Sequence, residues 1–174
     1  MAMRPRLRKA MHSLHLIVSV GWLGAIAAYL SLDVTTVISD DVPTLRAAYL
    51  GMDTIVTTVI VPLAIVSLVT GLVVSLGTRW GLFRHYWVLI SLLLTVVGTV
   101  VLLVETQTIA AHAGLATDQT ISARELQTIP STLVHSIGGM IVLTVVLILN
   151  VYKPKGLTPY GWRRQQRVDK RVRT

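Results

Sequence analysis

Four apolar stretches, each long enough to cross a lipid bilayer, constrain this 174-residue chain more than any other feature of its sequence. They cover roughly residues 14–34, 55–76, 86–108 and 133–152. A hydrocarbon core about 30 Å thick needs about 20 mostly apolar residues in a helix. Lipid offers no partner to an unpaired backbone group, so such stretches span as helices. The sequence therefore predicts an all-α integral membrane four-helix bundle, with residues 1–174 forming a single transmembrane domain.

The composition agrees with this class. Apolar residues make up 53% of the chain and charged residues only 14%, whereas soluble domains carry about 25% charged residues. So few charges cannot cover a water-exposed surface, which excludes the soluble and the disordered classes. The chain has no cysteine, which excludes disulfides, thiolate metal sites, iron–sulfur clusters and thiol catalysis.

The charged residues divide between two sets of connections. All but two of the 16 basic residues lie at the N-terminus, between the second and third spans, and in the tail. All but one of the eight acidic residues lie on the other side. Basic connections stay in the cytoplasm, and an even number of spans places both termini on one side. We therefore expect both termini to be cytoplasmic and the chain to lie in a bacterial cytoplasmic (inner) membrane.

Residues 153–174 form a basic cytoplasmic tail whose first role is this topology signal. Its lysines and arginines suit anionic lipid headgroups, and Trp162 suits the membrane interface. No folded basic module is evident, so we expect no nucleic-acid partner. The N-terminal region is similar to a signal peptide ending at Ala25-Ile26-Ala27. Because its apolar character continues through Leu32, we expect an uncleaved span.

Histidines near the span ends are the main candidates for a functional site. Depth sorts them into a cytoplasmic layer of His12, His15 and His85 and an outer layer of His112 and His135. A helix rises 1.5 Å per residue, so His85 and His112 are about 40 Å apart on an unbroken third span and cannot share a site. In the first span, helical periodicity places His15, Trp22, Tyr29 and Asp33 on one face.

A neutral imidazole binds haem iron or copper, and bundle interiors host such sites between facing helices. One layer would pair His15 with His85, and the other would pair His112 with His135. We therefore predict these four histidines as ligands of haem b or, alternatively, copper. The non-functional alternative is an interfacial histidine bonded to a carbonyl or a headgroup. Asp33 and Glu105 are candidates for proton transfer, or else ordinary outer-interface charges.

Local signals add detail to the helices and links. Pro62 lacks a backbone N–H and is expected to kink the second span. Ser67 and Gly71 allow a close helix approach there. The outer link near residues 110–130 contains Ser122 followed by Glu125, the spacing of a capping box, which predicts a short surface helix.

The segment from His15 to Ala25, HLIVSVGWLGA, resembles a His-x6-Trp-x-Gly first-helix pattern. That pattern occurs in copper-resistance D-type membrane proteins and in membrane protoporphyrinogen oxidases of the HemJ type. The strings at residues 77–87 and 152–162 resemble small four-helix membrane proteins of actinobacteria, over most of the chain. The resemblance implies a bundle that uses its first-helix histidine for haem or metal. The oxidases often follow this motif with a basic residue and a further histidine in the same helix. This chain has Asp33 and no such histidine, so that activity is not carried over.

Three functions follow as alternatives. The first is a membrane redox protein that binds b-type haem for electron transfer, with a quinone or respiratory partner. The second is a copper-handling membrane protein. The third is a cofactor-free accessory subunit of a larger membrane complex, with which the short links and the lack of a catalytic motif are compatible.

Overall fold

The computed structural model describes residues 3–78 and 80–173, and most of them are helical. In chain order the elements are α1 (Pro5–Ile38), α2 (Val42–Ile55), the π-helical segment η1 (Val56–Ile60), α3 (Val61–Gly77), α4 (Tyr86–Thr117), α5 (Ala123–Gln127), α6 (Leu133–Tyr152) and α7 (Pro159–Arg173). Four helical units are long and apolar enough to cross a membrane: α1, the continuous unit α2–η1–α3, α4 and α6. The prediction of an all-α multi-pass membrane bundle is therefore confirmed.

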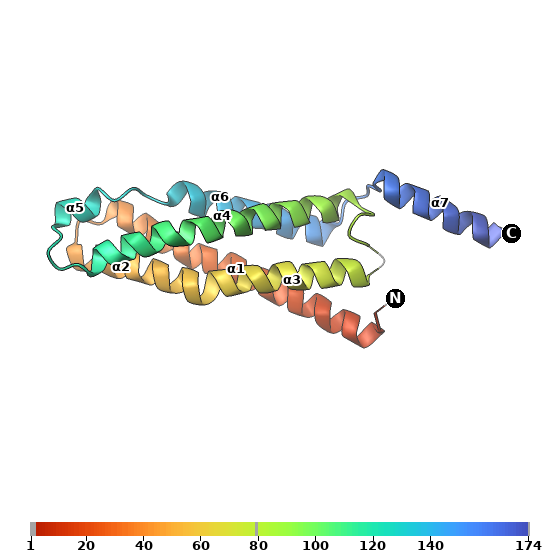
Figure 1. The fold of residues 1–174 in the computed structure, drawn as a ribbon, viewed down its shortest axis with the longest axis horizontal. Coiled ribbons are helices and arrows are strands. Elements are labelled where there is room, and N and C mark those ends of the chain that lie inside the picture. The colour runs from red at the N-terminus through yellow and green to blue at the C-terminus, as the bar shows by residue number, and fades with distance from the viewer. Residues whose placement is uncertain (1–2, 79, 174) are drawn as a thin grey trace.

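The four long units run side by side, and the chain enters and leaves the bundle at the same end (Figure 1). We call the end with the start of α1, the α3–α4 connection and α7 the basic end, and the end with α5 the acidic end. Helices α1 and α4 each pack along both α3 and α6, but their packing on each other is slight at most. They are therefore the diagonal pair of the bundle.

The helices extend beyond the apolar stretches that predict them. Helix α1 begins at Pro5 rather than near residue 14, and α4 continues to Thr117 rather than ending near residue 108. Hydropathy detects the part of a helix that suits lipid. The polar turns at both ends continue the same backbone hydrogen bonding outside that part.

Large apolar side chains lie on the outside of the bundle. Ile17 is 68% exposed and Val134 is 81% exposed, as expected where the surrounding solvent is lipid rather than water. The interior face of α1 contains Trp22, Tyr29 and Asp33, all buried. This confirms the predicted polar and aromatic stripe and shows that it faces the other helices.

The second long unit changes its helical winding just before its proline. The amide of Val61 donates to the carbonyl of Val56, five residues back, which defines the π-helical segment. Pro62 follows in the first turn of α3, a position where the missing N–H of a proline is tolerated. The kink expected at Pro62 stays a prediction, and the structure adds a π segment on the N-terminal side of this proline.

Polar contacts close the acidic end. The guanidinium of Arg46 donates to the carbonyl oxygens of Ala116, Asp118 and Ile121 at 2.6, 2.7 and 2.9 Å. It thus supplies partners at the C-terminus of α4, where helix carbonyls have none of their own. Helix α5 begins with the predicted capping box between Ser122 and Glu125.

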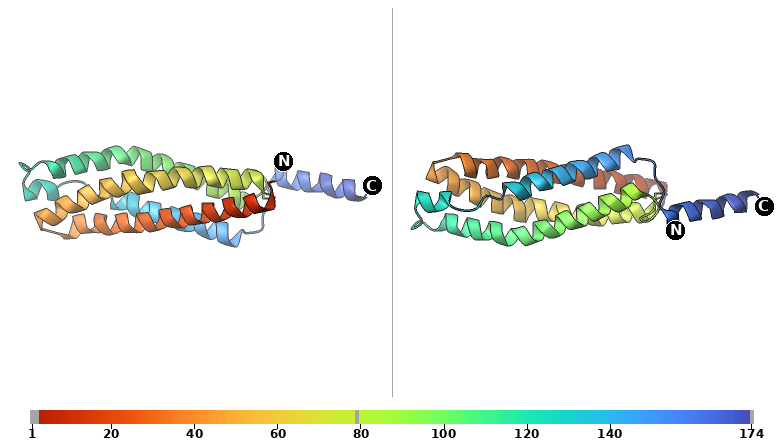
Figure 2. Two further views of the ribbon diagram at one scale, coloured as in Figure 1. Left: turned by 90° about the horizontal axis from the view of Figure 1, so that it is seen from below. Right: turned by 90° about the horizontal axis from the view of Figure 1, so that it is seen from above.

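A small set of backbone contacts positions α7 at the basic end. The amide of Thr158 donates to the carbonyl of Arg84 at 3.0 Å, and the amide of Tyr86 donates to the carbonyl of Gly156 at 3.3 Å. Gly161, in the first turn of α7, lies directly against the carbonyl of Arg84. From this root α7 extends beyond the bundle in both views of Figure 2.

We predict that Gly161→Ala loosens the root of α7. The added methyl group would collide with the Arg84 carbonyl, and overpacking of this kind costs about 1–3 kcal/mol. Amide hydrogen exchange at Thr158 should accelerate about tenfold or more. Gly114→Ala is the matched control, because a methyl group there meets nothing within 4 Å. Equal exchange in the two variants would show that the root does not depend on this contact.

We also predict a titration effect in the capping box of α5. The backbone N–H and hydroxyl of Ser122 donate to Glu125 and lower the pKa of its carboxyl. The stabilisation is therefore present above the ordinary pKa and is lost as the pH falls through the lowered value. Ser122→Ala should raise the pKa of Glu125 part of the way back, as measured by NMR titration. Thr120→Ala should instead raise the pKa of Asp118 and leave Glu125 low.

Candidate functional site

A cavity lies between α1, α3, α4 and α6, near the basic end of the bundle. It has a volume of about 120 Å³ and is lined by Trp22, Trp80 and Trp87, so we call it the tryptophan cavity. An engineered cavity of about 150 Å³ holds a benzene molecule. The tryptophan cavity is therefore of a size that suits one aromatic ring.

Four polar atoms around this cavity are buried and have no hydrogen-bond partner among the described residues. They are the indole Nε1 of Trp22, the indole Nε1 of Trp87, and the hydroxyls of Thr78 and Ser91. All four residues line the tryptophan cavity. Trp22, Trp87 and Ser91 are 3%, 6% and 7% exposed. Buried polar groups in native structures are almost always paired, so their gathering around one cavity indicates a place for a ligand or for water.

His15 lines the same cavity and is held by a threonine. Its Nδ1 lies 3.1 Å from the hydroxyl oxygen of Thr70. Gly71 leaves room for the ring, because a methyl group at Gly71 would stand 3.0 Å from Cε1 of His15. The small residues predicted to allow close helix approach thus also make space for an imidazole.

Among the residues that the structure describes, no acidic side chain lines the tryptophan cavity. At its basic-end side, Lys153 ends α6 in a left-handed conformation with φ of 46°. Its ammonium group stands 5.8 Å from the centroid of the Trp80 ring. The charged and N–H groups around the cavity are therefore donors, which favours a ligand that carries hydrogen-bond acceptors.

His85 packs beside this cavity without lining it. Its Nδ1 lies 2.7 Å from the carbonyl oxygen of Trp80. Its ring contacts those of Trp80 and Trp87, with centroids 5.2 and 6.4 Å away. His15 and His85 thus belong to the same layer, as the sequence predicts, but they do not share the cavity.

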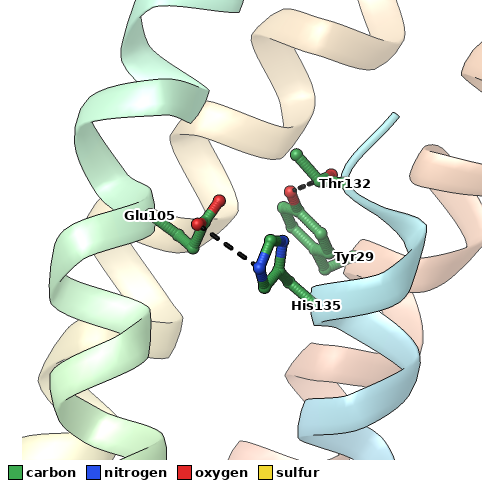
Figure 3. Close-up of polar contacts among 4 residues, drawn as sticks. All are labelled: Tyr29, Glu105, Thr132 and His135. Atoms are coloured by element: carbon green, nitrogen blue, oxygen red, sulfur yellow. Dashed lines mark hydrogen bonds and ion pairs between the residues drawn. The ribbon is translucent and has the colours of Figure 1, made fainter. Parts of the chain in front are cut away.

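A second cavity, of about 80 Å³, lies toward the acidic end and is lined by Glu105, His135 and Tyr29. We call it the glutamate cavity. Nε2 of His135 stands 3.6 Å from Oε1 of Glu105, and the hydroxyls of Tyr29 and Thr132 are 2.9 Å apart. Figure 3 shows these side chains, contributed by α1, α4, α6 and the residue before α6, turned toward one another. The π segment also contributes to the wall, through Val56 and Ile60.

The remaining predicted residues lie near this second cavity. Asp33 is fully buried, and its Oδ2 accepts a hydrogen bond of 2.7 Å from the hydroxyl of Ser136. Its Oδ1 has no partner in the described part of the chain. His112 is buried edge-on against Tyr49, with ring centroids 6.0 Å apart. His112 does not line the cavity that His135 faces.

Neither predicted histidine pair lines a common cavity. Over residues 3–78 and 80–173, no group of three or more histidine, aspartate or glutamate side chains could hold a metal ion. Drug-sized ligands occupy pockets of about 300–1,000 Å³, and a haem macrocycle belongs to that size class. The tryptophan cavity, at about 120 Å³, is smaller than pockets of that class. Haem and copper ligation stay predictions from the sequence.

The donors on α4 are residues that sequence reasoning did not select. Trp87, Ser91 and Thr95 follow one another at intervals of four residues and line the tryptophan cavity together. That spacing puts polar and aromatic groups on a single face of an apolar helix. The same helical spacing of polar and aromatic residues identifies the stripe on α1. The face on α4 contains no histidine among these three residues.

Comparisons with family models, with curated proteins and with solved structures give no match to this chain. The functional interpretation therefore depends on the geometry of the two cavities.

We predict that Ser136→Ala destabilises the bundle. It would remove the hydrogen bond to the fully buried Asp33 carboxyl, and leaving a buried polar group unpaired costs about 1–3 kcal/mol. The free energy of unfolding in bicelles measures the loss. Thr144→Ala is the control on the same helix, because its exposed hydroxyl bonds only the carbonyl of Met140. Equal losses would mean that the Asp33 contact contributes nothing specific.

Proposed function

We propose that this multi-pass membrane protein binds a small lipid-soluble ligand in the tryptophan cavity, and that the ligand carries oxygen atoms that accept hydrogen bonds. The observation that carries the proposal is the set of four buried, unpartnered polar atoms around a single cavity. Two of them are indole nitrogens, which only donate. A ligand that satisfies them must therefore present acceptors.

The position of the cavity supports a ligand that arrives through the membrane. Its walls belong to α1, α3, α4 and α6, all of them parts of units long and apolar enough to span. Between the polar groups the lining contains apolar side chains such as Leu16, Val88 and Leu143. Such a mixture suits an apolar body with a few polar atoms.

A redox role in a bacterial cytoplasmic membrane is part of the same proposal. A lipid-soluble ring compound of the quinone class meets the requirements of size and acceptor atoms, and it is the partner expected from the sequence. Arg163, Arg164 and Arg167 are exposed on α7 and support contact with anionic lipid headgroups. Haem binding gains no support from the size of the cavity, and copper handling gains none from the separated histidines.

Blocking the cavity tests the proposal. Gly71→Leu would push an isobutyl group toward His15, whereas Gly24→Leu projects into open space. We expect about one equivalent of a lipid-soluble oxygen compound in organic extracts of the wild type purified in mild detergent. The Gly24→Leu protein should retain it and the Gly71→Leu protein should lose it, as measured by mass spectrometry. The competing interpretation is that water alone fills the cavity. Identical extracts from the wild type and the two variants would favour water.

The same samples test haem binding. Spectra of the oxidised and dithionite-reduced protein, made in a haem-replete host, would show a sharp reduced α band if haem were bound. A flat visible spectrum would remove the haem hypothesis and leave the proposal above intact.

A further inference from the structure

Resting on the proposed function, we propose that the ligand of the tryptophan cavity is a quinol, a hydroquinone-class ring that donates a hydroxyl hydrogen to Nε2 of His15 and accepts hydrogen bonds from indole N–H groups. The proposal depends on the hydrogen-bond direction at His15. It also depends on the placement of three of the four unpartnered groups on diagonal helices.

The hydrogen-bond direction at His15 follows from Thr70. The hydroxyl of Thr70 has a single hydrogen, and it donates that hydrogen to the carbonyl of Val66 at 2.7 Å. Toward Nδ1 of His15, at 3.1 Å, the same oxygen must therefore accept. A neutral imidazole carries its hydrogen on only one nitrogen. With that hydrogen on Nδ1, Nε2 of His15 is left as an acceptor.

Three of the four unpartnered groups lie on two sides of the cavity, and the fourth, Thr78, follows the end of α3. Trp22 belongs to α1, like His15, whereas Trp87 and Ser91 belong to α4. Because α1 and α4 are the diagonal pair of the bundle, the two sets stand on opposite walls. A flat ring with an oxygen atom at each of two opposite edges can meet both walls at once. This is the arrangement of oxygens in a hydroquinone or a quinone.

The acceptor on His15 distinguishes between these two forms. A hydroquinone oxygen both donates and accepts, so it can serve Nε2 of His15 and an indole N–H together. A quinone oxygen only accepts and leaves Nε2 unpaired. An ionised fatty acid or phosphate headgroup also only accepts, so it has the same mismatch. The cavity should therefore prefer the reduced ring.

We would test this preference by NMR with the full chain in lipid nanodiscs. The chain has four tryptophans, three of which line the cavity, whereas Trp162 is 57% exposed on α7. Titrations would use methylhydroquinone, methylbenzoquinone and the dimethyl ether of methylhydroquinone. The ether keeps both oxygens and loses both donors. Methylhydroquinone should shift the indole N–H signals of Trp22 and Trp87 but not that of Trp162.

The expected result is a Kd for methylhydroquinone about tenfold or more below those of the quinone and the ether. The Thr70→Val protein should bind all three with similar affinity, because His15 can then carry its hydrogen on either nitrogen. His15→Phe should also remove the preference. Thr70→Val keeps the test decisive if His15→Phe does not fold. The His135→Phe protein is the control, since His135 lines the other cavity, and it should keep the preference.

Three results would overturn the inference. Equal affinity of the wild type for the three compounds would leave the proposed function standing with an acceptor-only ligand. An undiminished preference in the Thr70→Val protein would show that this threonine does not set the hydrogen on His15. If none of the compounds shifts the cavity tryptophans, the quinol is excluded, and the extraction experiment with Gly71→Leu alone then decides the proposed function.

Discussion

Lipid cannot form hydrogen bonds, and this constraint means that the polar side chains of the spanning helices need partners other than lipid. Water would satisfy an outward serine, tryptophan or aspartate, but a hydrocarbon tail cannot. Exposed hydroxyls such as that of Thr144 bond the backbone of their own helix, and the buried polar groups gather in the interior around two separate cavities. Ile26 and Leu143 are buried in the apolar core of the bundle, with Ile26 lining the glutamate cavity and Leu143 lining the tryptophan cavity. The bundle thus consists of two polar layers with different chemistry.

The two layers differ in the kind of polar group they offer. The tryptophan cavity combines indole N–H groups with an imidazole, and no carboxylate of the described residues lines it. The glutamate cavity combines Glu105 and His135 with the Tyr29–Thr132 pair, and the buried Asp33 is bonded to Ser136 beside it. An uncharged ring matches the first layer, whereas the second is internally paired apart from one carboxylate oxygen of Asp33.

Much of the fold was predictable from the sequence, and much of the candidate site was not. Length and apolarity predict the four spanning units, and helical periodicity predicts the buried face of α1. The pairing of histidines depends on how helices are rotated against one another, which a single sequence does not encode locally. His85 therefore lies against Trp80, and His112 lies against Tyr49. Ser91 was missed because a hydroxyl on an apolar helix usually bonds its own backbone, and Thr78 was missed because it lies just after the end of α3. Their lack of partners becomes visible only in three dimensions.

The π segment determines how the wall residues of the two cavities are oriented relative to each other around the helix axis. It holds one residue more than an α-helix would need over the same length. One residue corresponds to a turn of about 100° around the helix axis. Val56 and Ile60 line the glutamate cavity, whereas Ser67 and Gly71, further along the same unit, line the tryptophan cavity. The extra residue therefore rotates one part of the continuous helix α2–η1–α3 relative to the other. As a result, the wall residues on both sides of the π segment face the bundle interior. Removing a single residue from Val56–Ile60 would rotate one set of wall residues toward the lipid, without altering any side chain that lines the tryptophan cavity.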